Sequence, residues 1–249
     1  ELKPLEIKIQ RDIIKIQSVF SKVMKKEDLL YLRVASFDAN VTEDLEKIIN
    51  ENKDKKGFIL DLRNNPGGLL SQAIGVVDLF VDKGIIVSQK GRTAEDEEKF
   101  EASSSNTRTK LPLVVLVNEG SASASEIVSG SLQDHKRAIV IGEKTFGKGS
   151  VQAVLPIDNE RTENIKLTIA KYYLPSGRTI QAVGVTPDII ASAGKVTQAE
   201  DNAFKIKEAD LKKHLEGELE KVTDVKADVK KEAKALANET KKVITSEDI

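Results

Sequence analysis

The chain has 249 residues, with 39 basic and 40 acidic side chains, a formal net charge of −1 and no cysteine. This balance favours neither nucleic acid nor anionic membranes as partners, and the lack of cysteine excludes disulfides and thiolate metal sites. No signal peptide and no apolar span of about 18 residues is present. The opening residues read as the middle of a strand, so we expect a trimmed sequence.

The first part of the chain predicts strands followed by an amphipathic helix. Residues 1–20 alternate apolar and polar side chains, which predicts one or two strands, and residues 29–37 (LLYLRVASF) predict another. Residues 41–56 predict a helix that has Thr42 as its N-cap and an apolar face turned inward.

The next segment alternates strand and helix patterns. Residues 57–63 (GFILDLR) predict a buried strand, which an NNPGG turn connects to a helix over residues 69–82. Residues 84–92 predict another strand, and the polar residues 93–110 have the composition of a mobile flap. Strands and helices that alternate in this way indicate an α/β core.

A serine-rich stretch then organises the centre of the chain. Residues 111–117 (LPLVVLV) predict a buried strand, and residues 121–136 (SASASEIVSGSLQDHK) predict a helix that begins with small hydroxyl residues. Residues 138–142 (AIVIG) predict a strand, and a glycine-rich turn (TFGKGS) leads to a further strand over residues 151–157. This order places a serine at a strand-to-helix turn and a lysine on a loop that leads into a neighbouring strand.

The residue types around this turn favour acyl transfer. The free amides and the positive dipole end of a helix N-terminus stabilise an oxyanion that develops beside a serine. The two histidines, His135 and His214, lie in no motif. A lysine serves as the base instead when burial keeps its amine neutral. Lys148 lies between two glycines, which indicates a tight bend that aims its side chain.

This stretch resembles the C-terminal processing peptidases, also called tail-specific proteases, which use a serine–lysine pair. The resemblance implies that Ser123 is the nucleophile, that Lys148, 25 residues later, is the base, and that Gln152 orients the lysine. If a strand begins at this point, Lys148 and Gln152 share one of its faces, because strand side chains alternate with period two.

Two further motifs extend the resemblance. GFILDLRNNPGGLL resembles the family's strand and glycine turn, and KYYLPSGRTIQAVGVTPDI resembles its closing segment, so the resemblance covers residues 28–190, about two thirds of the chain. It implies an oxyanion hole formed by the amide of Ala124 and by one amide of the NPGG turn. That second amide is Gly68 or Gly67, and we prefer Gly68.

Other polar residues beside these motifs favour structural roles. Asp61 and Arg63 are typical of an ion pair at a strand end. We interpret Asp134 as a hydrogen-bonding group near the end of the helix, and Glu126 as a support for the serine turn rather than a base. His135 stands among charged residues, so we expect it on a solvated surface.

The resemblance also implies a division of the chain. Residues 28–190 are expected to form a ClpP/crotonase-like protease core. Residues 1–27 would be a strand segment that adjoins a PDZ domain, the peptide-binding module of the family, most of which is missing from this sequence, removed or naturally absent. Residues 191–249 are rich in both charges and carry a narrow apolar stripe, which predicts a helical arm that either packs along the core or pairs subunits.

The implied function is a serine endopeptidase that cleaves proteins near apolar C-terminal tails through an acyl-enzyme. The resemblance implies no metal or cofactor, a periplasmic or otherwise extracytoplasmic location, a homo-oligomer and an activating adaptor as an option. Two alternatives stay open. One is a catalytically silent scaffold of the same fold that binds peptide tails, and the less favoured one is a crotonase-like enzyme that acts on acyl thioesters.

Overall fold

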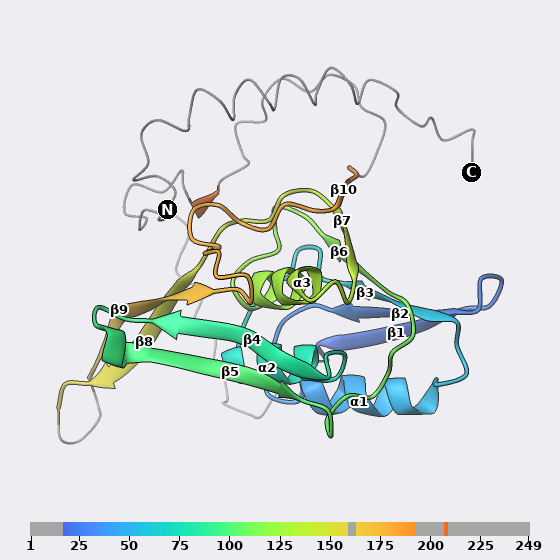
Figure 1. Cartoon of the computed structure of the whole chain (residues 1–249), viewed down its shortest axis with the longest axis horizontal. Coiled ribbons are helices and arrows are strands. Elements are labelled where there is room, and N and C mark those ends of the chain that lie inside the picture. Colours follow the sequence, from blue (N-terminus) through green and yellow to red (C-terminus); the bar gives the residue numbers. More distant parts are fainter. Residues whose placement is uncertain (1–16, 159–162, 193–206, 209–249) are drawn as a thin grey trace, which may run out of the picture.

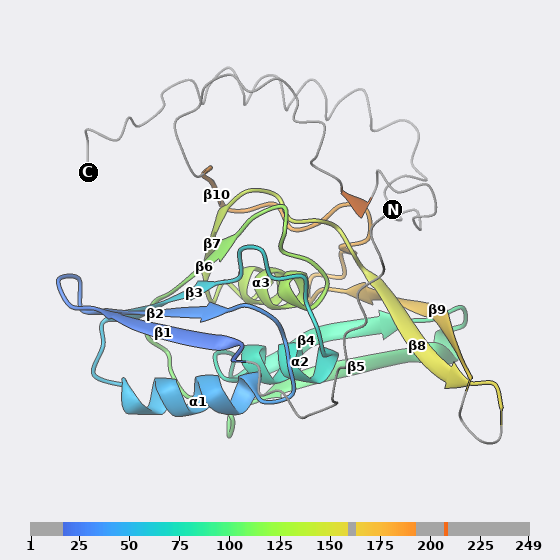
Figure 2. The ribbon, with the colours of Figure 1, turned by 180° about the vertical axis from the view of Figure 1, so that it is seen from behind.

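The computed structural model describes residues 17–158, 163–192 and 207–208, and all statements below concern this part of the chain. It contains a six-stranded sheet, three helices and a four-stranded sheet (Figures 1 and 2). Helix α3 contacts strand β7 of the larger sheet and strand β4 of the smaller one, so it lies between the two sheets. This mixed architecture confirms the α/β class.

The larger sheet is mostly parallel. Its spatial order is β1 (Val19–Met24), β2 (Leu29–Val34), β3 (Gly57–Asp61), β6 (Leu113–Val117), β7 (Ile139–Gly142) and β10 (Ile189–Ile190). Only β1 and β2 pair antiparallel. The inner strands β3 and β6 are short apolar runs that are largely buried, as parallel strands covered on both faces must be.

Three helices pack in sequence order against one another. They are α1 (Val41–Glu51), α2 (Leu70–Asp78) and α3 (Ala124–Asp134), and α2 contacts both of the others. Leu45 and Ile49 of α1 are fully buried, as its amphipathic pattern predicts. The predicted N-cap is wrong: Asn40 occupies that position, and the amide of Thr42 donates instead to Oε1 of Gln72 in α2, 2.9 Å away.

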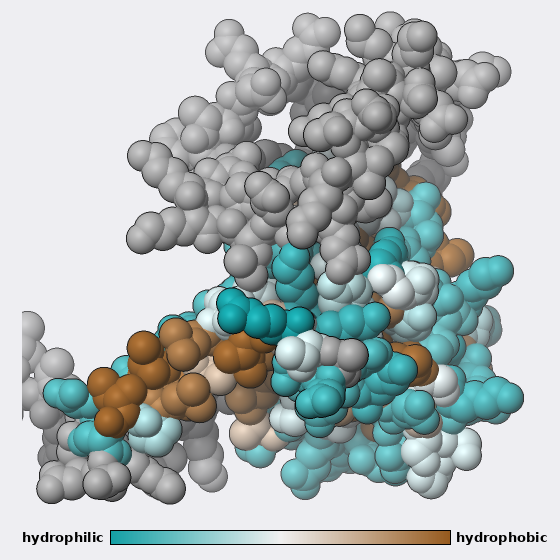
Figure 3. Space-filling view, turned by 60° about the vertical axis from the view of Figure 1, so that its left-hand side comes forward, coloured by the Kyte–Doolittle hydropathy of each residue, from teal (hydrophilic) through white to brown (hydrophobic). Residues whose placement is uncertain are grey.

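The smaller sheet is antiparallel and follows the order β5 (Glu97–Ser103), β4 (Lys83–Lys90), β9 (Asn164–Tyr173) and β8 (Ser150–Pro156). The hairpin of β8 and β9 extends away from the core (Figures 1 and 2). Leu155 pairs with Ile165, and Ala153 pairs with Leu167, so these side chains share one face of the hairpin. That face is apolar and exposed, and Figure 3 shows the apolar surface gathered there.

The mobile flap predicted for residues 93–110 is wrong. This segment contains a short 3₁₀ turn (Ala94–Asp96) and then β5, which pairs with β4 along its whole length. Strand β5 is an edge strand with mostly exposed side chains, so it keeps a polar composition while only Phe100 and Ala102 pack on the core. Only these two positions alternate as apolar residues, so the sequence pattern does not distinguish the strand from a polar loop.

The division of the chain expected at the N-terminus stays a prediction. Within the segment 1–27, β1 pairs with β2 and so belongs to the core sheet, while residues 1–16 lie outside the described residues. The predicted arm over residues 191–249 also lies outside them, apart from 191–192 and 207–208. Among the described helices, none is long and apolar enough to cross a membrane.

Candidate active site

Ser123 lies at the turn that joins β6 to α3, one residue before the helix begins. Its backbone has φ +55° and ψ −112°, which is uncommon for a residue with a side chain and is characteristic of strained functional turns. The residue is half-buried and therefore partly accessible to solvent. This is the strand-to-helix position that the sequence predicts for a nucleophile.

The two neighbouring serines differ from Ser123 in their surroundings. Ser121 is fully buried, and its hydroxyl donates to the carbonyl of Leu62 at 2.8 Å. Ser125 is also fully buried, and its hydroxyl donates to the carbonyl of Asn65 at 2.9 Å. Both hydroxyls hold the turn together, which leaves Ser123 as the accessible serine of the three.

The carboxylate of Glu126 connects the serine turn to the lysine loop. Its Oε2 accepts hydrogen bonds from the amides of Ser123 (2.8 Å) and Lys148 (2.9 Å). Its Oε1 accepts from Oγ1 of Thr145 (2.6 Å) and from the amide of Gly147 (2.7 Å). One buried carboxylate thus fixes the backbones of Ser123 and Lys148 relative to each other, and the support role expected for Glu126 is confirmed.

The burial of Glu126 also sets its protonation. Burial raises the pKa of this carboxyl to about 7, although hydrogen bonds from Thr145 and from three amides act in the opposite direction. The ionised form accepts at both oxygens and fits all four donors, whereas a proton on either oxygen removes part of that capacity. The geometry of the lysine loop is therefore tied to the charge of Glu126.

Lys148 is half-buried in the loop that leads from β7 to β8, and the tight bend predicted around it is confirmed. Gly147 has a φ of +102°, a region that strains any residue with a side chain. At Gly149, a side-chain carbon would lie 2.5 Å from the backbone nitrogen of Gln181. Both glycines are thus required by the path of the loop.

The NNPGG turn after β3 packs directly on the serine turn. A side-chain carbon at Gly67 would lie 2.9 Å from Cβ of Ser123 and 3.0 Å from the amide nitrogen of Ala124, so glycine is needed there. Asn65 holds the turn in place, because its Nδ2 donates to the carbonyl of Val34 and its Oδ1 accepts from the amide of Gly67, at 2.8 and 2.9 Å.

Residues 28–191 match the family model described as Peptidase family S41, which covers more than half of the chain. The chain belongs to peptidase family S41. This membership confirms the family that the motifs indicate and agrees with the ClpP/crotonase-like core expected from them.

Curated relatives of this S41 chain are processing proteases. It is 45% identical to the carboxy-terminal-processing protease of Bartonella bacilliformis over 224 residues, which are 88% of this chain and 51% of that protein. It is 39% identical to the carboxy-terminal processing protease CtpA of Bacillus subtilis, over 75% of this chain and 40% of that one. The chain thus spans about half the length of these relatives, or less.

A solved structure shares the same fold. The photosystem II D1 C-terminal processing protease aligns with a TM-score of 0.63 and 33% identity, over 72% of this chain and 49% of that one. Mature CPAF, at 16% identity and a TM-score of 0.55, resembles it in fold alone.

Gln152 is exposed on β8. The backbone between Lys148 and Gln152 is not the regular strand that was expected. The strand begins at Ser150, after the lysine, and its pairing with β9 shifts between Val151 and Gln152. Alternation with period two therefore does not carry from Lys148 to Gln152, and the orienting role of Gln152 stays a prediction.

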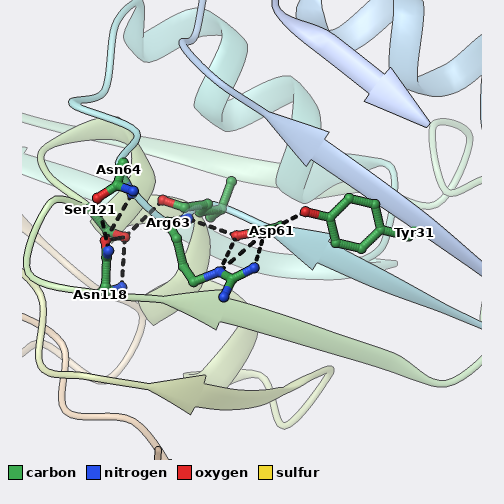
Figure 4. A network of polar contacts seen from close by, with 7 residues as sticks. Tyr31, Asp61, Arg63, Asn64, Asn118 and Ser121 are labelled. Carbon is green, nitrogen blue, oxygen red and sulfur yellow. Dashed lines mark hydrogen bonds and ion pairs between the residues drawn. The ribbon is translucent and has the colours of Figure 1, made fainter. Parts of the chain in front are cut away.

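Asp61 and Arg63 form the expected ion pair beside this site (Figure 4). Arg63 donates from Nη2 to Oδ2 of Asp61 at 2.6 Å, and the hydroxyl of Tyr31 donates to the same oxygen at 2.5 Å. Burial by itself would raise the pKa of the Asp61 carboxyl, but these hydrogen bonds outweigh burial and the pKa is lowered. The pair anchors the end of β3, just before the NNPGG turn.

Two further expectations have different outcomes. Asp134 accepts from the amide of Ser176 at 3.0 Å and pairs with Arg178 at 2.9 Å, which confirms its structural role. The solvated surface expected for His135 is wrong. Its ring is half-buried against Gly84, and Nε2 lies 2.8 Å from the carbonyl of Ile85, because the end of α3 packs on β4.

Several polar residues of the site escaped the sequence analysis. Asn65, Thr145 and Gln181 are all buried and hold the turn or the loop, but nothing in their spacing marks them. A cavity of about 430 Å³ beside Arg63 and Asn118 has neither Ser123 nor Lys148 in its lining. Within the described ranges, no three His, Cys, Asp or Glu residues are grouped to hold a metal ion.

Proposed function

We propose that this chain carries the catalytic core of a serine endopeptidase of the C-terminal processing type. The observation that carries the proposal is the shared acceptor: one oxygen of Glu126 binds the amides of both Ser123 and Lys148. Two residues 25 positions apart are thereby held as one unit, as a nucleophile and its base require. The accessible position of Ser123, against the buried Ser121 and Ser125, supports it as the nucleophile.

The proposed reaction begins when the neutral amine of Lys148 takes the proton from the hydroxyl of Ser123. The serine oxygen attacks the peptide carbonyl, and the amine of the leaving peptide then receives that proton from Lys148 as the peptide bond breaks. Water, activated by the same lysine, attacks the acyl-enzyme and releases the second product. Gln152 is proposed to orient Lys148.

The negative charge of the tetrahedral intermediate is proposed to be held by two amides. Ala124 supplies one, since the first amides of a helix have no intrahelical acceptor. Gly68 is favoured for the other, because the amide of Gly67 already donates to Asn65. The close packing of the glycine turn on Ser123 supports this pairing of donors.

The relatives' names suggest the substrate class, so we propose protein substrates cleaved near their C-termini, at apolar tails. An extracytoplasmic location, a homo-oligomer and an activating adaptor are further parts of this proposal. The chain spans about half the length of these relatives or less, so their substrates, location and assembly come to this chain only as proposals.

Digestion of a denatured protein such as casein tests the proposal. We expect wild type to release peptides, Ser123→Ala to lose turnover while keeping its fold, and Ser125→Ala to keep most activity. Loss at Ser125 with retention at Ser123 would move the nucleophile. Folded wild type without turnover would favour a binding scaffold, and turnover of a coenzyme A thioester instead of casein would favour a crotonase-like enzyme.

A further inference from the structure

Three successive amides of the lysine loop are held by two buried side chains. Glu126 accepts from Gly147 and Lys148, as described above, and Oε1 of Gln181 accepts from the amide of Gly149 at 2.9 Å. Gln181 has no exposed surface. The lysine is thus fixed from both sides, by a carboxylate on the side of the serine and by an amide oxygen on the other.

The chain around Gln181 runs alongside the loop. The amide of Ala182 donates to the carbonyl of Gly147 at 2.8 Å, and the amide of Gln181 donates to Oγ1 of Thr179 at 3.1 Å. The backbone of Gln181 passes so close to Gly149 that no side chain would fit between them. These contacts fix the backbone of Gln181 beside the loop without any contribution from Glu126.

Gln181 also reaches the chain that follows the core. Its Nε2 donates to Oε1 of Glu208 at 3.3 Å, and the amide of Glu208 donates to the carbonyl of Phe146 at 3.3 Å. Glu208 thus contacts the lysine loop twice, once directly and once through Gln181. These contacts join a residue far along the sequence to the backbone on both sides of Lys148.

We propose that Gln181 is a positioning residue for Lys148, acting through the amide of Gly149, and that Glu208 holds Gln181 in place from the C-terminal side. The proposal rests on the function proposed above, with Lys148 as base. Without the Gln181 oxygen, the amide of Gly149 is left unpaired, and the glycines on either side of the lysine are free to turn. If Lys148 is no longer aimed at the serine hydroxyl, the chemical step slows, whereas substrate binding is unchanged.

The first test replaces Gln181 with methionine, which has a similar shape and no amide. We expect kcat to fall about 10- to 100-fold with KM unchanged, because a shift of about 1 Å has an effect of that size. Gln72→Met is a matched control, since it removes another side-chain acceptor from a backbone amide, that of Thr42, in a contact between α1 and α2. It should leave kcat at the wild-type value.

A charge exchange separates positioning from general packing. Gln181→Glu keeps the acceptor for Gly149 but faces the carboxylate of Glu208, so kcat should fall. The double variant Gln181→Glu/Glu208→Gln restores a donor opposite that acceptor, and kcat should recover to within about threefold of wild type, since the interaction is then re-formed with its polarity reversed. No recovery in the double variant would contradict the proposed role of Glu208.

Hydrogen exchange of the peptide that covers residues 146–150 gives a readout that needs no turnover. We expect faster exchange there in Gln181→Met, with the strands of the six-stranded sheet unchanged. Wild-type kcat in Gln181→Met, or exchange that rises equally across the core, would overturn the positioning role. Turnover that survives Ser123→Ala would instead overturn the proposed function, while the exchange data would still decide whether Gln181 holds the loop.

Discussion

The two sheets differ in how they are held. In the six-stranded sheet, β3 and β6 are buried for most of their length, and residues such as Leu60 and Val115 have no exposed surface. In the four-stranded sheet, β8 and the first part of β9 are mostly exposed, and Leu167 has 42% of its surface open. The first sheet gains its stability from burial, whereas the second depends more on its backbone ladder.

The candidate pair spans this difference. Ser123 lies in the turn that follows β6 of the buried sheet, while Lys148 lies on the loop that leads to β8 of the exposed one. The serine turn and the lysine loop therefore belong to different sheets, and no common apolar face holds them at a set distance. The buried polar contacts of Glu126 hold the two backbones together instead. Substitutions in each region should therefore act on different properties.

The largest effect on stability is expected in the buried sheet. Leu60→Ala removes a fully buried side chain from β3 and should lower the free energy of unfolding by about 3 to 4 kcal/mol. Urea denaturation followed by circular dichroism measures it. A change below about 1 kcal/mol would show that the buried sheet does not dominate stability.

Arg63→Met should cost about 3 kcal/mol, because it leaves the buried carboxylate of Asp61 without its cation. The direction in which this stabilisation changes with pH follows from the pKa of Asp61. The pKa of Asp61 is lowered in the fold, so the pair stabilises the protein above the unfolded pKa of about 3.9, and this contribution is lost as the pH falls through the folded pKa. Denaturation midpoints of wild type and variant should converge in acid, and a constant gap would contradict the assignment.

Glu126→Gln should cost about 2 kcal/mol at pH 8, because one of its two acceptor atoms becomes a donor that faces other donors. The folded pKa of about 7 lies above the unfolded value of about 4.3, so folding takes up a proton between them and Glu126 favours the fold more at pH 5 than at pH 8. The variant should lack this component of the pH dependence. Equal pH slopes in both proteins would argue against a raised pKa.

The smallest effect is expected on the exposed hairpin. Leu167→Ala should change the free energy of unfolding by no more than about 1 kcal/mol, because 42% of its surface is already exposed to water. The same urea experiment measures it beside Leu60→Ala. A cost above about 2 kcal/mol would mean that this apolar face is covered in solution.

The same contrast explains which elements could be predicted from sequence. Strands such as 113–117 are continuous apolar runs, so their pattern identifies them alone. Strand β5 is an exposed edge strand with a polar sequence. It is a strand because it pairs with β4, and its own residues do not predict that pairing. The N-cap of α1 and the packing of His135 likewise depend on tertiary contacts with α2 and β4.

The site divides in the same way. Ser123 and Lys148 stand in motifs whose glycines and small residues mark unusual backbone, and those φ values are found. Gln181 and Asn65 act through hydrogen bonds of their carboxamides, with acceptor contacts across 32 and 2 residues. Such contacts leave no periodicity in the sequence, so only the fold reveals them.

The most direct test of the central claim labels the nucleophile without a substrate. Wild type, Lys148→Met and Lys148→Arg are treated with a serine-reactive sulfonyl fluoride, and the adduct is located by peptide mass mapping. We expect one adduct on Ser123 in wild type and labelling at least about 100-fold slower in both variants, because neither side chain can accept the serine proton. Labelling of Ser123 at the wild-type rate in Lys148→Met would contradict the Ser–Lys pair.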